Sequence, residues 1–221
     1  MSEIVLLGRL LPEENIDEMT EAQMTLFTLL EALNEEYRSI IQLPFKMLTA
    51  SDFQVVLKPH ERIFQLLDDF RLIFLPHRVE MGIGIGQINR QFLQRKEALL
   101  DGTAVEAAKK ALSLLESKND YGVLSLMVVG PDRHQLDIEA LNGLLAATSF
   151  MSASWTKNQE VVLLRLLGMG IYSERFSNKE LAQEMGLSPS ALTKRVKASG
   201  LKIYLRNRTT ASRMLMRIAN D

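Results

Sequence analysis

Hydroxyl and basic side chains recur at helical spacing near the C-terminal end of the chain. A predicted helix over residues 189–199 would present them on one side, and the set is Ser188, Ser190, Thr193, Lys194 and Lys197. Side chains of these types form hydrogen bonds with base edges and phosphate oxygens in a DNA major groove. The spacing therefore predicts a recognition helix for double-stranded DNA.

More cationic residues follow on the next predicted helix. They include Lys202, Arg206 and Arg208, and the sequence has no Asp or Glu between Glu184 and Asp221. We expect these three side chains to add phosphate contacts, which would make DNA binding strongly dependent on salt. A helical protein-interaction module with a basic surface is the alternative. RNA is a weaker one, because no aromatic stacking platform is recognisable.

Capping residues mark the ends of the helices around this segment. Ser177 and Glu180 have the spacing of a capping box at the start of one helix. Gly186 suits a turn with positive φ, and Gly200 suits the end of the following helix. Ala182 is small enough for the two helices to approach closely. The apolar residues expected between them are Met185, Leu187, Leu192 and Val196.

The N-terminal half offers a candidate nucleotide pocket, made of an acidic hairpin tip, a glycine-rich strand and an acidic helix start. Its residues are Asp52, Gly82, Gly84, Gly86 and Asp101. The carboxylate at the hairpin tip could hold a divalent metal near a triphosphate, and the helix N-terminus near the sheet could bind an anion. Each feature also has a structural interpretation: a turn residue, close packing of a helix on the sheet, and a helix cap. For the glycines, close packing is the preferred interpretation.

Residue counts exclude several kinds of site. The three histidines are scattered without ligand spacing, and one carboxylate alone makes a poor metal site. We therefore expect no catalytic residue, no metal and no cofactor. The sequence has no cysteine, which excludes disulfides and thiolate zinc sites and is typical of a reducing cytoplasm. No apolar run is long enough to cross a bilayer, so we expect a cytoplasmic protein without a membrane partner.

Charge is distributed unevenly along the chain. Residues 1–150 carry 14 Lys or Arg and 22 Asp or Glu, which gives a net charge of −8. Residues 151–221 carry 12 Lys or Arg and 5 Asp or Glu, which gives +7. An acidic body with a basic end is the pattern expected when that end meets nucleic acid.

Hydrophobic periodicity predicts the order β-α-β-β-α-β-α-β over residues 1–131. Two alternating segments, 45–49 and 53–57, are close enough in sequence to form an antiparallel hairpin. The order predicts an α+β fold, a ferredoxin-like, palm-type sandwich with helices on one face of a mixed sheet. A doubly wound parallel sheet is the alternative, which the hairpin disfavours.

Strand signals end after a last predicted strand over residues 121–129. We expect residues 132–154 to form a helical linker, and residues 155–221 to form an all-α helix-turn-helix domain. The expected organisation is thus an α+β domain over 1–131 followed by a DNA-binding domain.

Three segments resemble the SatD family of bacterial proteins: PFKMLTASDFQVVL, RVEMGIGIGQIN and DGTAVEAAKKALSLLE. With the opening strand and the C-terminal helix-turn-helix, the resemblance spans most of the chain. It implies an N-terminal domain like the palm of nucleotidyl and diguanylate cyclases, in agreement with the predicted strand order. Residues 177–200 also resemble helix-turn-helix segments of bacterial repressors and sigma-factor-like regulators.

The chain departs from this family pattern where carboxylates would stand. Members typically have Gly-Asp after the first strand and Gly-Asp-Glu-Phe-Gln at the hairpin. Here the first strand has Gly8-Arg9, and the hairpin reads Ala50-Ser51-Asp52-Phe53-Gln54. Cyclase-type phosphoryl transfer needs carboxylates that hold metal against the phosphates. We therefore expect the palm-like domain to be catalytically inactive.

Two functions compete at this point. The first is a transcriptional regulator, not an enzyme, whose palm-like domain forms a homodimer or senses a ligand such as a nucleotide. Two-fold pairing would match a pseudo-palindromic operator. The alternative is a nucleotide-binding or nucleotide-converting, cyclase-like enzyme with a basic regulatory tail.

Overall fold

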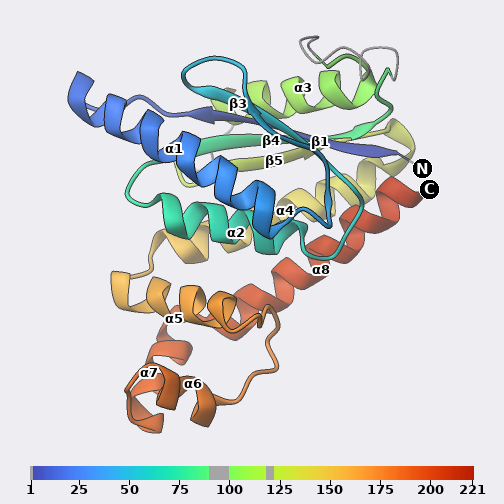
Figure 1. Cartoon of the computed structure of the whole chain (residues 1–221). Helices are drawn as coiled ribbons and strands as arrows, with labels where there is room; N and C mark the ends of the chain where they lie inside the picture. The colour runs from blue at the N-terminus through green and yellow to red at the C-terminus, as the bar shows by residue number, and fades with distance from the viewer. Residues whose placement is uncertain (1, 90–99, 118–121) are drawn as a thin grey trace.

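The computed structural model describes residues 2–89, 100–117 and 122–221 as a mixed α+β protein with a five-stranded sheet (Figure 1). The strands are β1 (Glu3–Leu10), β2 (Ile41–Met47), β3 (Asp52–Leu57), β4 (Val79–Gly86) and β5 (Leu126–Val129). The helices between them are α1 (Ile16–Glu36), α2 (Ile63–Phe74) and α3 (Thr103–Ser117). The predicted order β-α-β-β-α-β-α-β is confirmed, although β5 is shorter than expected, and residues 118–121 lie outside the described part.

Strand β1 lies at the centre of the sheet, whose order is β2-β3-β1-β4-β5. It pairs antiparallel with β3 on one side and with β4 on the other, while β5 adds to β4 in parallel. The predicted hairpin is confirmed, because β2 and β3 pair antiparallel. An apolar strand buried on both faces suits this central position.

Helices cover both faces of the sheet, so the expectation of helices on one face only is wrong (Figure 1). Successive side chains of a strand point to opposite faces. Ile4 and Leu6 of β1 lie in a core with α1 and α2, whereas Val5 and Leu7 lie in a second core with α3. The near-continuous apolar run of β1 is explained by this double burial.

The glycines of β4 let helix α3 lie directly on the sheet. A Cβ at Gly84 would be 1.9 Å from the carbonyl oxygen of Ala104, and one at Gly82 would be 2.4 Å from that of Ala108. A Cβ at Gly86 would be 2.6 Å from Oγ1 of Thr103. Close packing of these glycines is thereby confirmed. Their assignment to a nucleotide pocket is wrong, because the helix backbone fills the space beside them.

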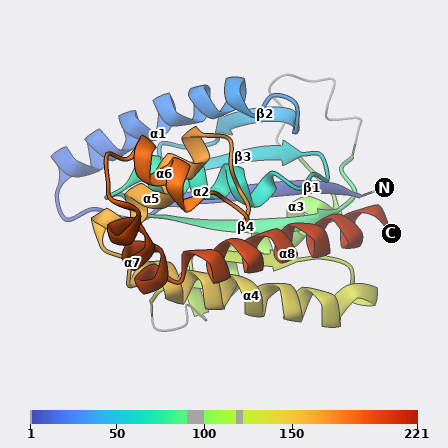
Figure 2. The ribbon, with the colours of Figure 1, turned by 90° about the horizontal axis from the view of Figure 1, so that it is seen from below.

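The C-terminal part is helical, as the sequence predicts. After a short 3-10 turn (Asp132–His134) come α4 (Gln135–Ala153), α5 (Lys157–Gly168), α6 (Asn178–Glu184), α7 (Pro189–Ser199) and α8 (Leu201–Asn220). Helix α4 packs beside the sheet with α8 alongside it, and α5, α6 and α7 form a separate group (Figure 2). The predicted linker is thus a long helix that packs on the first core.

Helix α8 belongs to two cores at once. Its first turns contribute Leu201 and Leu205 to the core of α5, α6 and α7. Its last turns contribute Leu215 and Ile218 to the core under the sheet, and the Ser2 amide donates to the Ala219 carbonyl at 2.8 Å. A boundary at residues 154–155 therefore does not separate the two cores.

Within the described ranges, no helix combines the length and apolar character needed to cross a membrane.

Candidate nucleic-acid interface

Two short helices, α6 and α7, are joined by a tight turn over residues 185–188. Ser177 begins α6, and its hydroxyl accepts from the Glu180 amide at 3.3 Å. Ser188 begins α7, and its hydroxyl accepts from the Ala191 amide at 3.2 Å. Gly186 in the turn and Gly200 after α7 have φ values of 63° and 64°, the left-handed region that glycine tolerates best. These predicted helix ends are confirmed.

Apolar side chains fix the angle between the two helices. Ala182 is 1% exposed, so α7 can approach the backbone of α6 at this point. The predicted wedge is confirmed in part: Leu192 and Val196 are buried in the core of this region, and Met185 and Leu187 are half-buried against it. The group is held by Leu163 and Leu166 of α5.

Trp155 anchors the end of α7 to the rest of the molecule. Its indole N–H donates to the Ser199 carbonyl at 2.8 Å, and its ring lies 4.7 Å from that of Tyr204. The orientation of α7 is thus set by buried contacts on its inner side, and the outer side is left to solvent.

The outer side of α7 carries most of the predicted DNA-contacting set. Ser188, Ser190, Lys194 and Lys197 are exposed, and they lie at the start of the helix and on its solvent side. The described residues include no ion pair that neutralises Lys194 or Lys197. Cationic side chains in such a position are available for phosphate or base contacts.

Thr193 differs from its neighbours. Its hydroxyl donates to the Pro189 carbonyl at 2.8 Å and accepts from the Asn178 side-chain amide at 3.4 Å. It is half-buried and links α7 to the start of α6. In this structure, the hydroxyl therefore fixes the arrangement of the two helices.

Lys202 and Arg206, on α8, are already engaged within the protein. The Lys202 ammonium lies 4.9 Å from the centre of the Phe176 ring. Arg206 donates to Oε2 of Glu174 at 2.6 Å, and this hydrogen bond lowers the pKa of the Glu174 carboxyl. A phosphate would therefore compete with the Phe176 ring for Lys202 and with Glu174 for Arg206, and their role in DNA binding stays a prediction.

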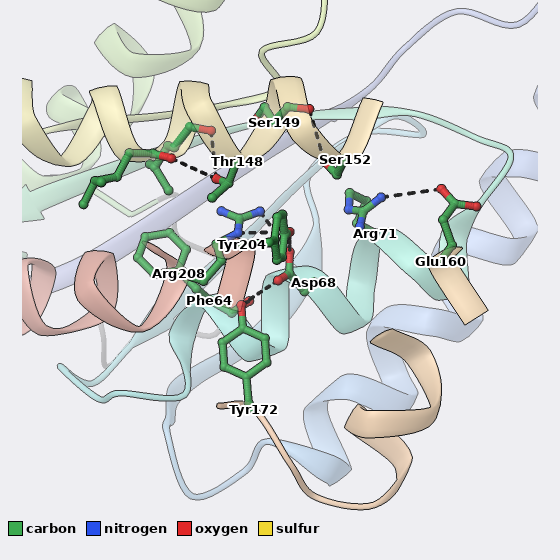
Figure 3. A network of polar contacts seen from close by, with 12 residues as sticks. Phe64, Asp68, Arg71, Thr148, Ser149, Ser152, Glu160, Tyr172, Tyr204 and Arg208 are labelled. Carbon is green, nitrogen blue, oxygen red and sulfur yellow. Dashed lines mark hydrogen bonds and ion pairs between the residues drawn. The ribbon is translucent and has the colours of Figure 1, made fainter. Parts of the chain in front are cut away.

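Arg208 is not a DNA-contacting residue. It is 5% exposed, and its Nη2 donates to Oδ1 of Asp68 on α2 at 2.9 Å (Figure 3). Asp68 is itself fully buried and also accepts from the hydroxyls of Tyr204 and Tyr172. The basic run that suggested a phosphate contact therefore contains a buried structural arginine.

The environment of this pair shifts several pKa values. Burial lowers the pKa of Arg208, but the charge of Asp68 and the interactions with Tyr204 and Tyr172 together outweigh burial, so the pKa is raised. Burial raises the pKa of Tyr204 to about 12 and that of Tyr172 well above its usual value. Arg208 therefore stays charged and both tyrosines stay protonated at neutral pH, as their hydrogen bonds require.

Two exposed cations were missed in the sequence analysis. Lys179 is in the first turn of α6, and Arg175 lies just before that helix; both are exposed. In DNA-binding helix pairs, the first helix crosses the phosphate backbone. The sequence signal for them is two basic residues that flank the Ser177 cap at the start of α6.

Asp52 lies beside Arg9 at the other side of the molecule, where the two residues are cross-strand neighbours in β3 and β1. Arg9 Nε donates to Oδ1 of Asp52 at 3.1 Å, and its Nη1 donates to Oε1 of Glu116 at 2.6 Å. The hydrogen bond to Asp52 raises the pKa of Arg9. Thr49 donates to the second oxygen of Asp52 at 2.9 Å, so each carboxylate oxygen accepts a hydrogen bond.

Asp101 is not near Asp52. It precedes the first turn of α3, whereas Glu116 beside Arg9 is in the last turn, about 20 Å away along the helix. Asp101 accepts from the Gly102 amide at 2.8 Å, and the Ala104 amide donates to the Gln87 carbonyl at 3.2 Å. The five residues of the candidate nucleotide pocket are therefore not brought together, and that prediction is wrong as a single site.

A family model described as the SatD family matches residues 3–215. The chain belongs to the SatD family. The match begins at the start of β1 and ends within α8, so it takes in the sheet, all three cores and the α6–α7 pair. No curated protein matches the chain.

In this SatD-family chain, the departures noted in the sequence lie around Arg9, which forms two ion pairs. The Arg9 guanidinium lies between the carboxylates of Asp52 and Glu116, where a metal would need free oxygen ligands. Over the described ranges, no three His, Asp or Glu side chains are grouped so that they could hold a metal ion.

Proposed function

We propose that the protein is a DNA-binding transcriptional regulator and that α6 and α7 form a helix-turn-helix. The proposal rests on the contrast between the buried inner side of α7 and its exposed, cationic outer side. Its inner side is fixed by Leu192, Val196 and the bond from Trp155, and its outer side presents exposed Lys194 and Lys197. A rigid helix with cations and small hydroxyls on its free side suits a major groove.

We infer that the sheet half is a ferredoxin-like, palm-type domain. Strands β2, β3, β1 and β4 are all antiparallel in this spatial order, and they alternate with α1 and α2 as in a split βαβ unit. Helix α3 and strand β5 are additions that cover the other face and extend the sheet.

The cyclase-like alternative is less well supported. Phosphoryl transfer would need the Asp52 carboxylate as a metal ligand, but it already accepts from Arg9 and Thr49. We therefore propose an inactive palm-like domain. Incubation with nucleoside triphosphates and Mg²⁺ or Mn²⁺ should give no cyclic or linear product. If the wild type forms such products and an Asp52→Ala variant does not, the cyclase-like function is supported instead.

We propose a homodimer as the unit that binds DNA. Two copies of α7 related by a two-fold axis would match a pseudo-palindrome with half-sites roughly 34 Å apart. Light scattering of the purified protein should give twice the mass of one chain. A nucleotide effector for the palm-like domain also stays a proposal, and a thermal-shift screen with nucleotides tests it.

Genome-wide recovery of bound DNA tests the proposed function. The wild type should enrich a small set of sites, and a Lys194→Ala/Lys197→Ala variant, which keeps the structural Thr193 hydroxyl, should lose that enrichment. Unchanged enrichment in the variant would place DNA contact on another surface. Absence of enriched sites for the wild type would contradict DNA binding itself.

A further inference from the structure

A pocket of about 420 Å³ lies between the sheet half and the α5–α7 group. Helix α2 contributes Arg71, α4 contributes Ser149 and Ser152, and α8 contributes Arg208. Trp155 and Glu160 close the side towards α5. Its volume is within the range of small-molecule sites, and it touches elements from both cores.

Arg208 brings an unused donor into this pocket. Its Nε donates to the Tyr204 hydroxyl at 3.1 Å and its Nη2 to Asp68 at 2.9 Å. Its Nη1 is buried and has no hydrogen-bond partner among the described residues. The side chain is 6% exposed, and Asp68 already balances its charge. A buried N–H group without an acceptor is unfavourable, so this atom favours a ligand acceptor.

Arg71 brings two more. Its Nη1 lies 3.8 Å from Oε1 of Glu160, while its Nε and Nη2 are buried and have no partner in the described structure. Nε and Nη2 form the edge of a guanidinium that binds two oxygens of one carboxylate or phosphate. Figure 3 shows the guanidinium groups of Arg71 and Arg208 below Ser149 and Ser152. Arg71 therefore offers a fork for an anion.

The rest of the wall is mixed in character. The described lining residues include three arginines, with Arg78 the third, against one glutamate, Glu160. Leu67, Phe74 and the Trp155 ring add apolar surface. A charged group at Arg71 would therefore lie next to space for an apolar or aromatic body.

We propose that this pocket binds a small organic anion, with a carboxylate or phosphate group joined to an apolar body. The anionic group accepts from Nε and Nη2 of Arg71, and Nη1 of Arg208 offers a further donor to an acceptor of the ligand in the same pocket. The apolar body lies against Phe74 and Trp155. This binding does not depend on the proposed DNA-binding function, and either one can fail without the other.

Trp155 is the one tryptophan of the sequence, so its fluorescence reports directly on the pocket. Benzoate and phenyl phosphate are the probes, with benzyl alcohol as the neutral control and inorganic phosphate as the control without an apolar body. Free N-acetyltryptophanamide corrects for absorption by the probes. We expect a saturable change in Trp155 fluorescence with benzoate or phenyl phosphate. The probe that binds more tightly shows whether the site prefers a carboxylate or a phosphate.

The controls decide the chemistry. No saturable change with either aromatic anion overturns the proposal. If benzyl alcohol binds as tightly as the aromatic anions, the ligand does not need an anionic group. If inorganic phosphate binds as tightly as phenyl phosphate, the ligand does not need an apolar body.

Arg71→Gln tests the fork. It should weaken binding by about tenfold or more, because two charge-assisted hydrogen bonds are lost. Arg165→Gln is the matched control, since Arg165 pairs with Glu184 on an exposed surface at 3.3 Å and should bind as the wild type does. Arg71→Lys keeps the charge without the fork and should fall between them. Wild-type affinity in a folded Arg71→Gln variant would contradict the site.

Discussion

At the scale of single residues, Asp68 joins parts of the chain that are far apart in sequence. It accepts from Arg208, Tyr204 and Tyr172, and none of these hydrogen bonds is open to solvent competition because Asp68 is fully buried. Removing one partner of such a buried pair leaves an uncompensated charge, which costs more than the pair contributes when intact.

Arg208→Met should therefore destabilise the protein by about 3–5 kcal/mol, because it leaves Asp68 buried without its cation. Arg206→Met on the same helix is the matched control. It breaks an exposed pair with Glu174 and should change stability little. Urea denaturation measures both. Equal stability of the two variants would contradict a structural role for Arg208.

Asp69 predicts a pH effect. Burial raises the pKa of its carboxyl, although the hydrogen bond from the Tyr37 hydroxyl at 2.6 Å opposes the shift. The folded state thus holds the proton more tightly than the unfolded state. The stabilisation that comes from this raised pKa is fully present below the ordinary pKa of Asp, about 3.9. It is lost as pH rises through the raised pKa of the folded state.

Wild-type stability should consequently fall relative to Asp69→Asn as pH rises from about 4. Asn keeps an oxygen that can accept from Tyr37, so the comparison isolates the ionisation. Denaturation curves of both proteins over this pH range give the difference directly. If the stability of the wild type relative to Asp69→Asn stays constant or increases as pH rises, the pKa of Asp69 is not raised.

At the scale of elements, local sequence signals were sufficient to predict where α6 and α7 begin and end. The sequence did not show which residues contact distant segments of the chain. Ser177, Ser188 and Gly200 mark the ends of α6 and α7, and each acts on backbone groups within a few residues. Arg208 was misassigned because its partner lies 140 residues away in sequence. The sequence of a basic helix does not show which of its cations will be buried in an ion pair with a distant carboxylate.

Gly84→Ala should destabilise the protein by about 1–3 kcal/mol or more, because its Cβ would meet the backbone of α3 rather than a side chain that can move. Gly143→Ala in α4 is the control. That site has no neighbouring atom within 4 Å, so alanine should stabilise by up to about 1 kcal/mol through helix propensity. Thermal unfolding compares them, and a neutral Gly84→Ala would mean that α3 does not lie on the sheet as described.

At the scale of the whole molecule, α8 couples the two cores. Its first turns pack with α5 and α7 and its last turns pack under the sheet, so neither core is complete without it. The sequence predicted two successive domains because the helical signals resume after β5. The packing of α8 on the first core was not predictable, because the apolar pattern of an amphipathic helix does not show which surface the helix packs against.

Leu215→Ala tests this coupling. The substitution lies in the sheet core and should cost about 2–5 kcal/mol. Trp155 fluorescence follows the α5–α7 core, and far-ultraviolet circular dichroism follows the whole chain. The two probes should give coincident unfolding transitions, both shifted by the substitution. Separate transitions, with only one shifted, would mean that the cores unfold independently.

The outer side of α7 is proposed to contact DNA, and the salt dependence of DNA binding tests this contact most directly. Fluorescence anisotropy gives the affinity for a recovered genomic site over a series of salt concentrations for the wild type, Lys194→Ala/Lys197→Ala and Lys109→Ala/Lys110→Ala. The last pair lies on α3, across the sheet from α7 (Figure 1).

Loss of two phosphate contacts should weaken binding and reduce the slope of log affinity against log salt by roughly 1.8. We expect that change for the α7 variant and wild-type behaviour for the α3 variant. An unchanged slope and affinity in Lys194→Ala/Lys197→Ala would contradict α7 as the DNA-contacting helix.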